Sequence, residues 1–149
     1  AILAVLTQFI VSVIILGSLY LFSHTSDTVN IERVFLAYGM IIALGLGIGT
    51  LNCFLFTLMP VWRLAWGVAT GPLVLISAVI YLFEDLPLIG QNILWYNPLV
   101  HAIGMARAGF FSSYHPNYIS EIFVLTCALV PAFFGVLMLR KYGRSILYL

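Results

Sequence analysis

The sequence predicts an all-α integral membrane protein, and two observations lead to this fold class. Of the 149 residues, 63% are hydrophobic and only 7% are charged, whereas a soluble domain carries roughly 25% charged residues. Four apolar runs contain no Asp, Glu, Lys or Arg, and each is close to the ~20 residues that cross a bilayer core. We therefore expect a single membrane domain over residues 1–149, with four transmembrane helices at about 1–23, 34–62, 64–83 and 122–139.

The first run begins at Ala1, with no basic stretch before it, which is a poor match for a signal peptide. We therefore expect the chain to be the later part of a longer protein. Its net charge of +1 argues against a nucleic-acid partner, because such partners select strongly basic surfaces.

The second and third runs carry small residues at helical spacing. Gly45, Gly49 and Asn52 share one face of the second run, and Gly67 and Gly71 form a similar pair in the third. Small residues spaced in this way let helix backbones approach closely. They favour either packing within one subunit or a subunit interface or pathway wall.

The distribution of basic residues predicts the orientation. If the four helices alternate in direction, four basic residues lie on one side of the membrane and two on the other. The first group is Arg63, Arg140, Lys141 and Arg144, and the second is Arg33 and Arg107. Because Lys and Arg are enriched on the cytoplasmic side, we expect a cytoplasmic C-terminus and an external segment over residues 84–121.

This external segment predicts a pair of short helices before the last span. Pro87 can begin one that runs to about Leu94, and Asn97 is a good N-cap for a second that runs from Pro98 to about Phe111. The second helix would reach about 21 Å, which is too short to cross the bilayer. The pair, at about 87–111, therefore either lies flat at the interface or re-enters the membrane and returns.

Two ionisable residues and many aromatic residues mark the helix pair. His101 favours a capping or packing role, with gating or substrate contact as the alternative, and Arg107 favours an interfacial anchor whose head reaches water. The aromatic residues suit an interfacial belt or a carbohydrate path, because their rings offer flat apolar faces to sugars. These aromatic residues are Trp95, Tyr96, Phe110, Phe111, Tyr114 and Tyr118.

The sequence has no phosphate-binding loop of the GxxxxGK[ST] type, no GxSxG nucleophile motif and no HExxH metal pair. Its three histidines are isolated from one another and from the cysteines, so no metal site or catalytic site is predicted. Ion-coupled carriers usually place ionisable groups inside the bilayer, and the four apolar runs have none. We therefore expect a conduit whose energy comes from another subunit.

The segment LWYNPLVHAIGMARAGFFSSYH, residues 94–115, resembles the region before the last span in permease subunits of type-2 ABC exporters of capsule and O-antigen polysaccharides. The shared pattern is an aromatic residue, Asn-Pro-Leu, a His, an Arg and an aromatic end. In this chain it corresponds to Tyr96, Asn97, Pro98, Leu99, His101, Arg107, Phe110 and Phe111. The chain departs from the pattern at Gly104, where members often carry an acidic residue.

The resemblance implies a polysaccharide or lipid-linked glycan exporter in the bacterial inner membrane, working as a permease homodimer among membrane lipids. The four runs would be the third to sixth of six spans. ATP and Mg would bind a separate ATPase subunit, and this chain would hold no cofactor. The helix pair would form an external gate whose glycan contacts are Trp95, Tyr96, Asn97, Pro98, His101, Arg107, Phe110, Phe111 and Tyr114. The alternatives are export of a drug or lipid by the same architecture, and a membrane enzyme or assembly factor.

Overall fold

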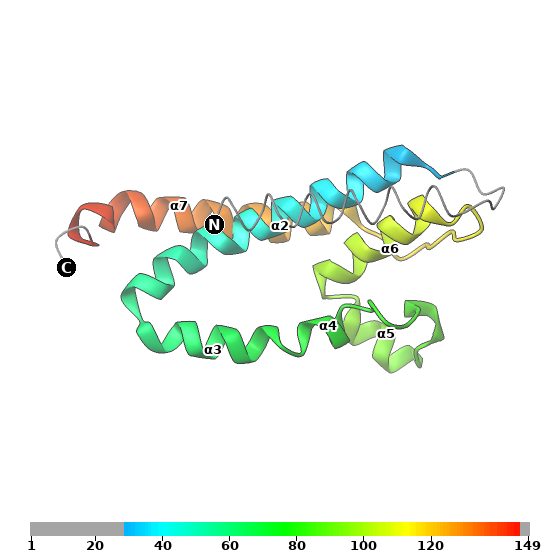
Figure 1. Cartoon of the computed structure of the whole chain (residues 1–149), viewed down its shortest axis with the longest axis horizontal. Coiled ribbons are helices and arrows are strands. Elements are labelled where there is room, and N and C mark those ends of the chain that lie inside the picture. The colour runs from blue at the N-terminus through cyan, green and yellow to red at the C-terminus, as the bar shows by residue number, and fades with distance from the viewer. Residues whose placement is uncertain (1–28, 147–149) are drawn as a thin grey trace, which may run out of the picture.

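The computed structural model of the chain describes residues 29–146. Within that range the protein contains helices and no strands, which agrees with the all-α prediction. In chain order the helices are α2 (Ile31–Leu58), α3 (Pro60–Thr70), α4 (Leu73–Ile76), the 3-10 helix η1 (Phe83–Asp85), α5 (Leu88–Leu94), α6 (Pro98–Phe110) and α7 (Glu121–Ile146) (Figure 1). The predicted span over residues 1–23 lies outside the described residues.

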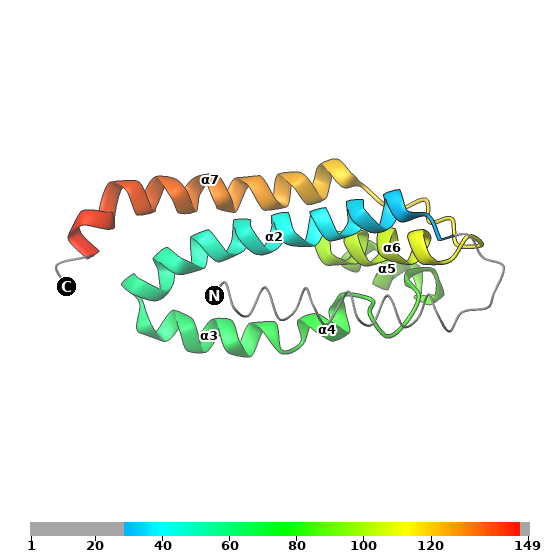
Figure 2. The same ribbon diagram turned by 45° about the horizontal axis from the view of Figure 1, so that its top comes forward.

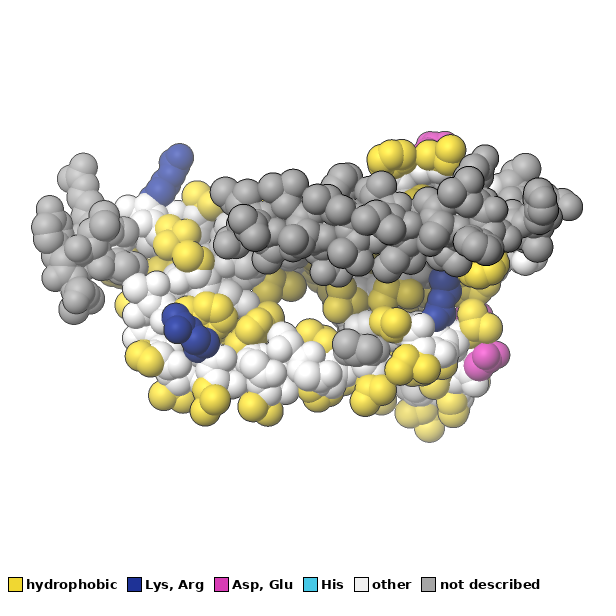
Figure 3. Space-filling view, viewed as in Figure 1, with side chains coloured by type: hydrophobic (Ala, Val, Ile, Leu, Met, Phe, Trp, Pro, Cys, Tyr) yellow, Lys and Arg dark blue, Asp and Glu magenta, His cyan; other side chains and the backbone are white. Residues whose placement is uncertain are grey.

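Helices α2 and α7 are the two described helices that are long and apolar enough to cross a membrane. Only 22% and 17% of their most apolar windows are buried inside the protein, which is far less than the core helix of a soluble protein would bury. In Figure 3, hydrophobic side chains are spread over the visible described surface, and the few charged ones lie toward the two ends of the molecule. Such a surface fits a lipid environment better than water.

Helices α2 and α7 lie side by side for most of their length (Figures 1 and 2). Two glycines allow this close approach. A Cβ atom on Gly47 would lie 2.0 Å from the carbonyl oxygen of Ala128, and one on Gly135 would lie 2.6 Å from the backbone nitrogen of Leu51. The contact between the two long helices is therefore largely a backbone contact that only glycine permits at these positions.

The glycines that the sequence pattern singled out lie elsewhere. Apart from the adjacent backbone of its own helix, no described atom comes within 4 Å of a Cβ atom built on Gly45, Gly49 or Gly67. Gly71 meets only a carbonyl oxygen of the preceding helical turn, at 3.6 Å. The described residues thus give these four positions no close helix–helix contact. Their alternative role, at a subunit interface or along a pathway, stays a prediction.

Asn52 has a clear role within the subunit. Its side chain is buried, and its Oδ1 accepts a hydrogen bond of 3.0 Å from Nε1 of Trp62. Helix α2 ends at Leu58 because Pro60 begins α3, so the single predicted helix over 34–62 is two helices joined by a tight turn. The Asn52–Trp62 bond ties these two helices together next to the turn.

The predicted third span, residues 64–83, is not one continuous helix. Helix α3 ends at Thr70, α4 spans only four residues after Pro72, and residues 77–82 are irregular. Ala78, in this stretch, is buried and has a positive φ of 55°. Proline disfavours continuation of a helix, so the sequence did contain a signal for an interruption. Residues 77–82 are called the break below.

The predicted helix pair is present, as α5 and α6, with boundaries within one residue of those expected. Helix α6 packs along the first half of α2 through Ala102 and Met105 against Met40 and Leu44. Near the start of α2, Gly109 meets Val34, so α6 runs antiparallel to α2. Helix α6 therefore lies along a candidate membrane span, and the position of the helix pair relative to the membrane stays a prediction.

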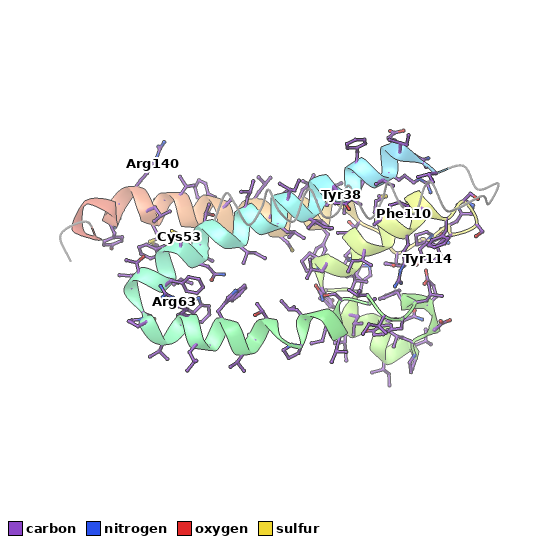
Figure 4. The ribbon with its side chains drawn as sticks, viewed as in Figure 1. Tyr38, Cys53, Arg63, Phe110, Tyr114 and Arg140 are labelled. Atoms are coloured by element: carbon purple, nitrogen blue, oxygen red, sulfur yellow. The ribbon has the colours of Figure 1, made fainter. Side chains whose placement is uncertain are left out.

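The molecule has two different ends. Figure 4 shows Arg63 and Arg140 at one end and Phe110 and Tyr114 at the other. The turn between α2 and α3 therefore shares an end with the last part of α7, as the alternating arrangement of spans requires. These are called the basic end and the helix-pair end.

Candidate functional site

The site is built around the turn between α5 and α6. Asn97 is the N-cap of α6, as predicted, because its Oδ1 accepts a hydrogen bond of 3.0 Å from the backbone N–H of Leu99. Pro98 occupies the first turn, where its missing N–H costs nothing. The Nδ2 of Asn97 donates a second bond, 3.0 Å long, to the carbonyl of Ile76 at the end of α4. The side chain of Asn97 therefore caps the start of α6 and also bonds to the end of α4.

Arg107, in the last turn of α6, makes a similar contact with the break. Its Nη1 donates to the carbonyl of Tyr81 at 2.7 Å, and its Nη2 donates to the carbonyl of Val79 at 2.8 Å. The guanidinium group thus bridges two carbonyls of irregular backbone. The expectation of a simple interfacial anchor reaching toward water does not describe this geometry.

His101 is completely buried, and both of its ring nitrogens are hydrogen-bonded. The backbone N–H of Ser120 donates to Nδ1 at 3.2 Å, which requires that Nδ1 carries no proton. The proton is therefore on Nε2, which donates to the carbonyl of Trp95 at 2.8 Å. This arrangement matches the packing role expected for His101, since the ring joins the α5–α6 turn to the residue before α7.

An aromatic cluster surrounds His101. Trp95 stacks on Phe123 with ring centroids 5.2 Å apart, and its Nε1 donates to the carbonyl of Tyr118 at 3.2 Å. Tyr118 in turn lies 4.1 Å, centroid to centroid, from Phe83. Trp95 and His101 therefore hold α5, α6 and the start of α7 together.

The close packing of this cluster explains why residue 104 is a glycine. A Cβ atom at this position would lie 2.4 Å from the hydroxyl oxygen of Tyr118, so any larger side chain would displace the ring. The departure from the family pattern at residue 104 is thus linked to the position of Tyr118. The sequence pattern alone gave no sign of this pairing.

A short polar network connects η1 with the loop after α6. The hydroxyl of Tyr114 lies 2.9 and 3.0 Å from the two carboxylate oxygens of Glu84 and 3.3 Å from the hydroxyl of Tyr118. Tyr114 donates its hydroxyl hydrogen to the carboxylate of Glu84, and the hydroxyls of Tyr114 and Tyr118 lie within hydrogen-bond distance of each other. Burial, followed by the bonds to Tyr118 and Glu84, raises the pKa of Tyr114 above its usual value. The hydroxyl therefore keeps its proton at neutral pH.

An open groove of about 630 Å³ lies between the break and the loop after α6. It brings together a cation, an anion and three aromatic rings. Three of its residues, Arg107, Phe111 and Tyr114, belong to the predicted contact set. The groove is lined by Ile80, Tyr81, Leu82, Asp85, Arg107, Phe111, Ser113 and Tyr114. A surface with flat apolar faces beside polar donors and acceptors is suited to a hydroxyl-rich ligand.

A second groove, of about 540 Å³, lies on the other side of α6 and is more polar. Charged residues from the first turns of α2 and α7, Glu32 and Glu121, line it together with Arg33 and His115. Within residues 29–146, no three His, Cys, Asp or Glu side chains gather closely enough to hold a metal ion.

The structure divides the predicted contact residues into two groups. Arg107, Phe111 and Tyr114 line the 630 Å³ groove, whereas Trp95, Asn97 and His101 bond to other parts of the folded chain and Pro98 begins α6. Tyr96 is highly exposed, at 72%, and Phe110 is half-buried at the end of α6. Asp85 and Glu84 were missing from the predicted set because nothing in their local sequence connects them with a loop 30 residues away.

No protein-family model matches the chain, but individual relatives do. The capsule polysaccharide export inner-membrane protein CtrC of Neisseria meningitidis serogroup B is 24% identical over 138 residues, 92% of this chain and 52% of that protein. The corresponding BexB protein of Haemophilus influenzae is 22% identical, over 78% of this chain and 44% of its own length. The polysialic acid transport protein KpsM of Escherichia coli is 22% identical, over 99% and 57%.

These relatives confirm the family resemblance that the segment 94–115 suggested. This chain spans about half the length of the curated relatives it matches. The similarity extends over most of the chain rather than over the helix pair alone, so it includes both long apolar helices.

Proposed function

We propose, from its homology to inner-membrane proteins of capsule polysaccharide export, that this chain is part of the transmembrane subunit of an ABC exporter. The exporter moves a polysaccharide or lipid-linked glycan across the bacterial inner membrane. The observation that carries the proposal is similarity over 92% of the chain to a capsule polysaccharide export protein and over 99% to a polysialic acid transport protein. The long apolar helices, with most of their surface turned outward, support a membrane location.

The proposal includes partners that lie outside this chain. Two copies of the permease form the pathway, and a separate ATPase subunit binds ATP and Mg and supplies the energy. We place the basic end, with Arg63 and Arg140, in the cytoplasm, since basic residues are enriched on that side. The helix-pair end then lies on the periplasmic side, where the exported chain leaves.

The 630 Å³ groove is the part of the helix-pair end that we propose contacts the glycan. Tyr81, Phe111 and Tyr114 offer rings on which sugar faces can pack. Ser113 and Asp85, which also line the groove, provide a donor and an acceptor for hydroxyl groups. This assignment narrows the contact set from the whole helix pair to one of its faces.

The test uses the full-length gene in its source bacterium. Deletion should abolish surface polysaccharide, and restoring the gene should bring it back. The purified subunit should bring down an ATPase, whose turnover should rise when the two are combined. Normal surface polysaccharide in the deletion strain, together with loss of drug resistance or of lipid transport, would overturn the glycan assignment.

The groove is tested by Phe111→Ala, with Ile89→Ala as the matched control. Both side chains are exposed, but only Phe111 lines the groove. Phe111→Ala should lower surface polysaccharide several-fold at equal protein level, and Ile89→Ala should leave it unchanged. Equal polysaccharide in both strains would remove Phe111 from the glycan contact.

A further inference from the structure

The break in the third predicted span raises a problem of hydrogen bonding. The last four carbonyls of any helix have no partner within that helix, and an unpaired carbonyl away from water costs several kcal/mol in a bilayer. At the end of α4 three of these carbonyls are paired by side chains. Ser77 donates to the carbonyl of Leu73, Tyr81 donates to that of Leu75 at 2.7 Å, and Asn97 donates to that of Ile76.

The donors that come from outside the span itself belong to α6. Asn97, at the start of α6, donates a hydrogen bond to the carbonyl of Ile76. Arg107, in the last turn of α6, donates to the carbonyls of Val79 and Tyr81. These three hydrogen bonds are called the clamp. The two ends of a single helix therefore hold two successive parts of the broken segment.

We propose that Asn97 and Arg107 are positioning residues, and that the clamp makes the break and α6 move as one body. Their main role is then to hold backbone carbonyls, rather than to contact the exported molecule. The link between this movement and transport rests on the proposed export function, whereas the clamp itself does not.

The type of side chain at residue 107 suits this role. A guanidinium group is planar and has five N–H donors, so it can bond to two carbonyls two residues apart at the same time. A lysine ammonium is a compact point charge on a flexible stem. It would keep the positive charge at residue 107 but would not fix both carbonyls in one geometry.

The clamp would also connect the two ends of the molecule. At the basic end, α3 is tied to α2 by the bond between Trp62 and Asn52. At its other end, α3 leads through α4 to the break, which the clamp joins to α6. A displacement of α3 at the basic end would thus be passed to the helix pair.

The experiment measures a distance in the full-length protein, in lipid nanodiscs without glycan. Cys53, Cys127 and any other cysteine are replaced by Ala, and spin labels are placed at Leu75 in α4 and Ile122 in α7. Both of these side chains are exposed, at 60% and 79%. Electron–electron double resonance then gives the width of the distance distribution between the labels.

Three variants alter the clamp in different ways. Arg107→Gln removes both bonds to the break, and Arg107→Lys keeps the charge. Asn97→Asp keeps the N-cap acceptor, since Asp is also a good N-cap, but it loses the donor to Ile76. Arg140→Gln is the matched control, because Arg140 is an exposed arginine on α7, away from the break.

The proposal expects the distribution to become at least twofold wider in Arg107→Gln and Asn97→Asp, with Arg107→Lys in between and Arg140→Gln unchanged. Because no glycan is present, a glycan-contact role would leave all four widths equal, and that result would overturn the clamp. If Arg107→Gln does not fold, the width of the distribution in Asn97→Asp tests the clamp by itself. If the Arg107 and Asn97 variants lost export while their distance distributions kept the wild-type width, the clamp would likewise be overturned, in favour of glycan contact. Failure of the wild-type gene to support export would overturn the proposed function instead, and the widths would still judge the clamp.

Discussion

The two halves of the molecule are stabilised in different ways. Around the middle of α2 and α7, the helices are long and apolar, and they meet through backbone contacts at Gly47 and Gly135. At the helix-pair end the helices are short, and side chains hydrogen-bond to backbone carbonyls across long sequence separations. Arg107 reaches back 26 and 28 residues to Tyr81 and Val79, and Trp95 reaches forward 23 residues to Tyr118.

The difference follows from what each half must satisfy. A continuous helix pairs its own carbonyls, so α2 and α7 need only shape complementarity to pack. A segment that breaks and turns leaves carbonyls unpaired and must find donors elsewhere. Polar side chains at the helix-pair end are therefore required by the backbone geometry even before any function is considered.

The largest loss of stability is expected when His101, in the helix-pair half, is substituted. His101→Leu leaves the N–H of Ser120 and the carbonyl of Trp95 without partners, and each buried unpaired group costs about 1–3 kcal/mol. We expect the free energy of unfolding, measured by titration with sodium dodecyl sulfate in mixed micelles, to fall by about 2–4 kcal/mol. His115→Leu, at an exposed histidine, is the control. Equal losses in the two variants would contradict the structural role of His101.

The next effect tests the other half through Gly47. In Gly47→Ala the added methyl group would overlap the carbonyl of Ala128, so the helices must separate, at a cost of about 1–3 kcal/mol. Gly45→Ala is the matched control on the same helix. It should be neutral or stabilising by up to ~1 kcal/mol, because alanine favours helix over glycine. A larger loss for Gly45→Ala would instead indicate that Gly45 lies at a subunit interface.

A smaller effect concerns the contact between Gly104 and Tyr118. Gly104→Ala should lower the free energy of unfolding by about 1–2 kcal/mol, because the methyl group displaces the tyrosine hydroxyl. Adding Tyr118→Phe removes that hydroxyl and should restore part of the loss. A double-mutant cycle measures this coupling. Strictly additive losses would mean that the two residues do not meet.

The smallest effect is expected for the Glu84–Tyr114–Tyr118 network. Tyr114→Phe should cost about 1 kcal/mol, as for a typical hydrogen bond, and Tyr96→Phe, at a highly exposed ring, should cost less. Because the pKa of Tyr114 is raised in the folded state, its contribution is fully present below the ordinary tyrosine pKa of about 10 and declines only at higher pH. A difference between Tyr114→Phe and wild type that changes between pH 6 and 8 would contradict this assignment.

The sequence predictions were accurate where structure depends on neighbouring residues, and they failed where it depends on residues far apart in the sequence. The boundaries of α5 and α6 were predicted within one residue, because Pro87, Asn97 and Pro98 act on their immediate neighbours. The break was missed although Pro72 signals an interruption, because the donors from α6 that pair its carbonyls are 20 or more residues away. The glycines that meet α7 within the chain, Gly47 and Gly135, were not singled out, because glycine spacing does not say which face of α2 meets α7.

The same reason explains the division of the predicted contact residues. The resemblance rests on a sequence motif, so all residues of the motif, including His101 and Arg107, were predicted to contact the glycan together with the aromatic residues. Their partners, Ser120, Val79 and Tyr81, carry no motif and are recognised only from the folded chain. The groove residue Asp85 was absent from the set for this reason as well.

Ala78 gives the break a further property. An L-residue at positive φ costs roughly 1–2 kcal/mol relative to glycine, which adopts that conformation freely. At φ 55° and nearly fully buried, the alanine methyl group packs with Phe83 and Val100, and the backbone around it has far fewer alternatives than a glycine would allow. The backbone of the break therefore has little conformational freedom. A rotation of the segment before it would be passed on to the segment after it rather than taken up by changes in the break.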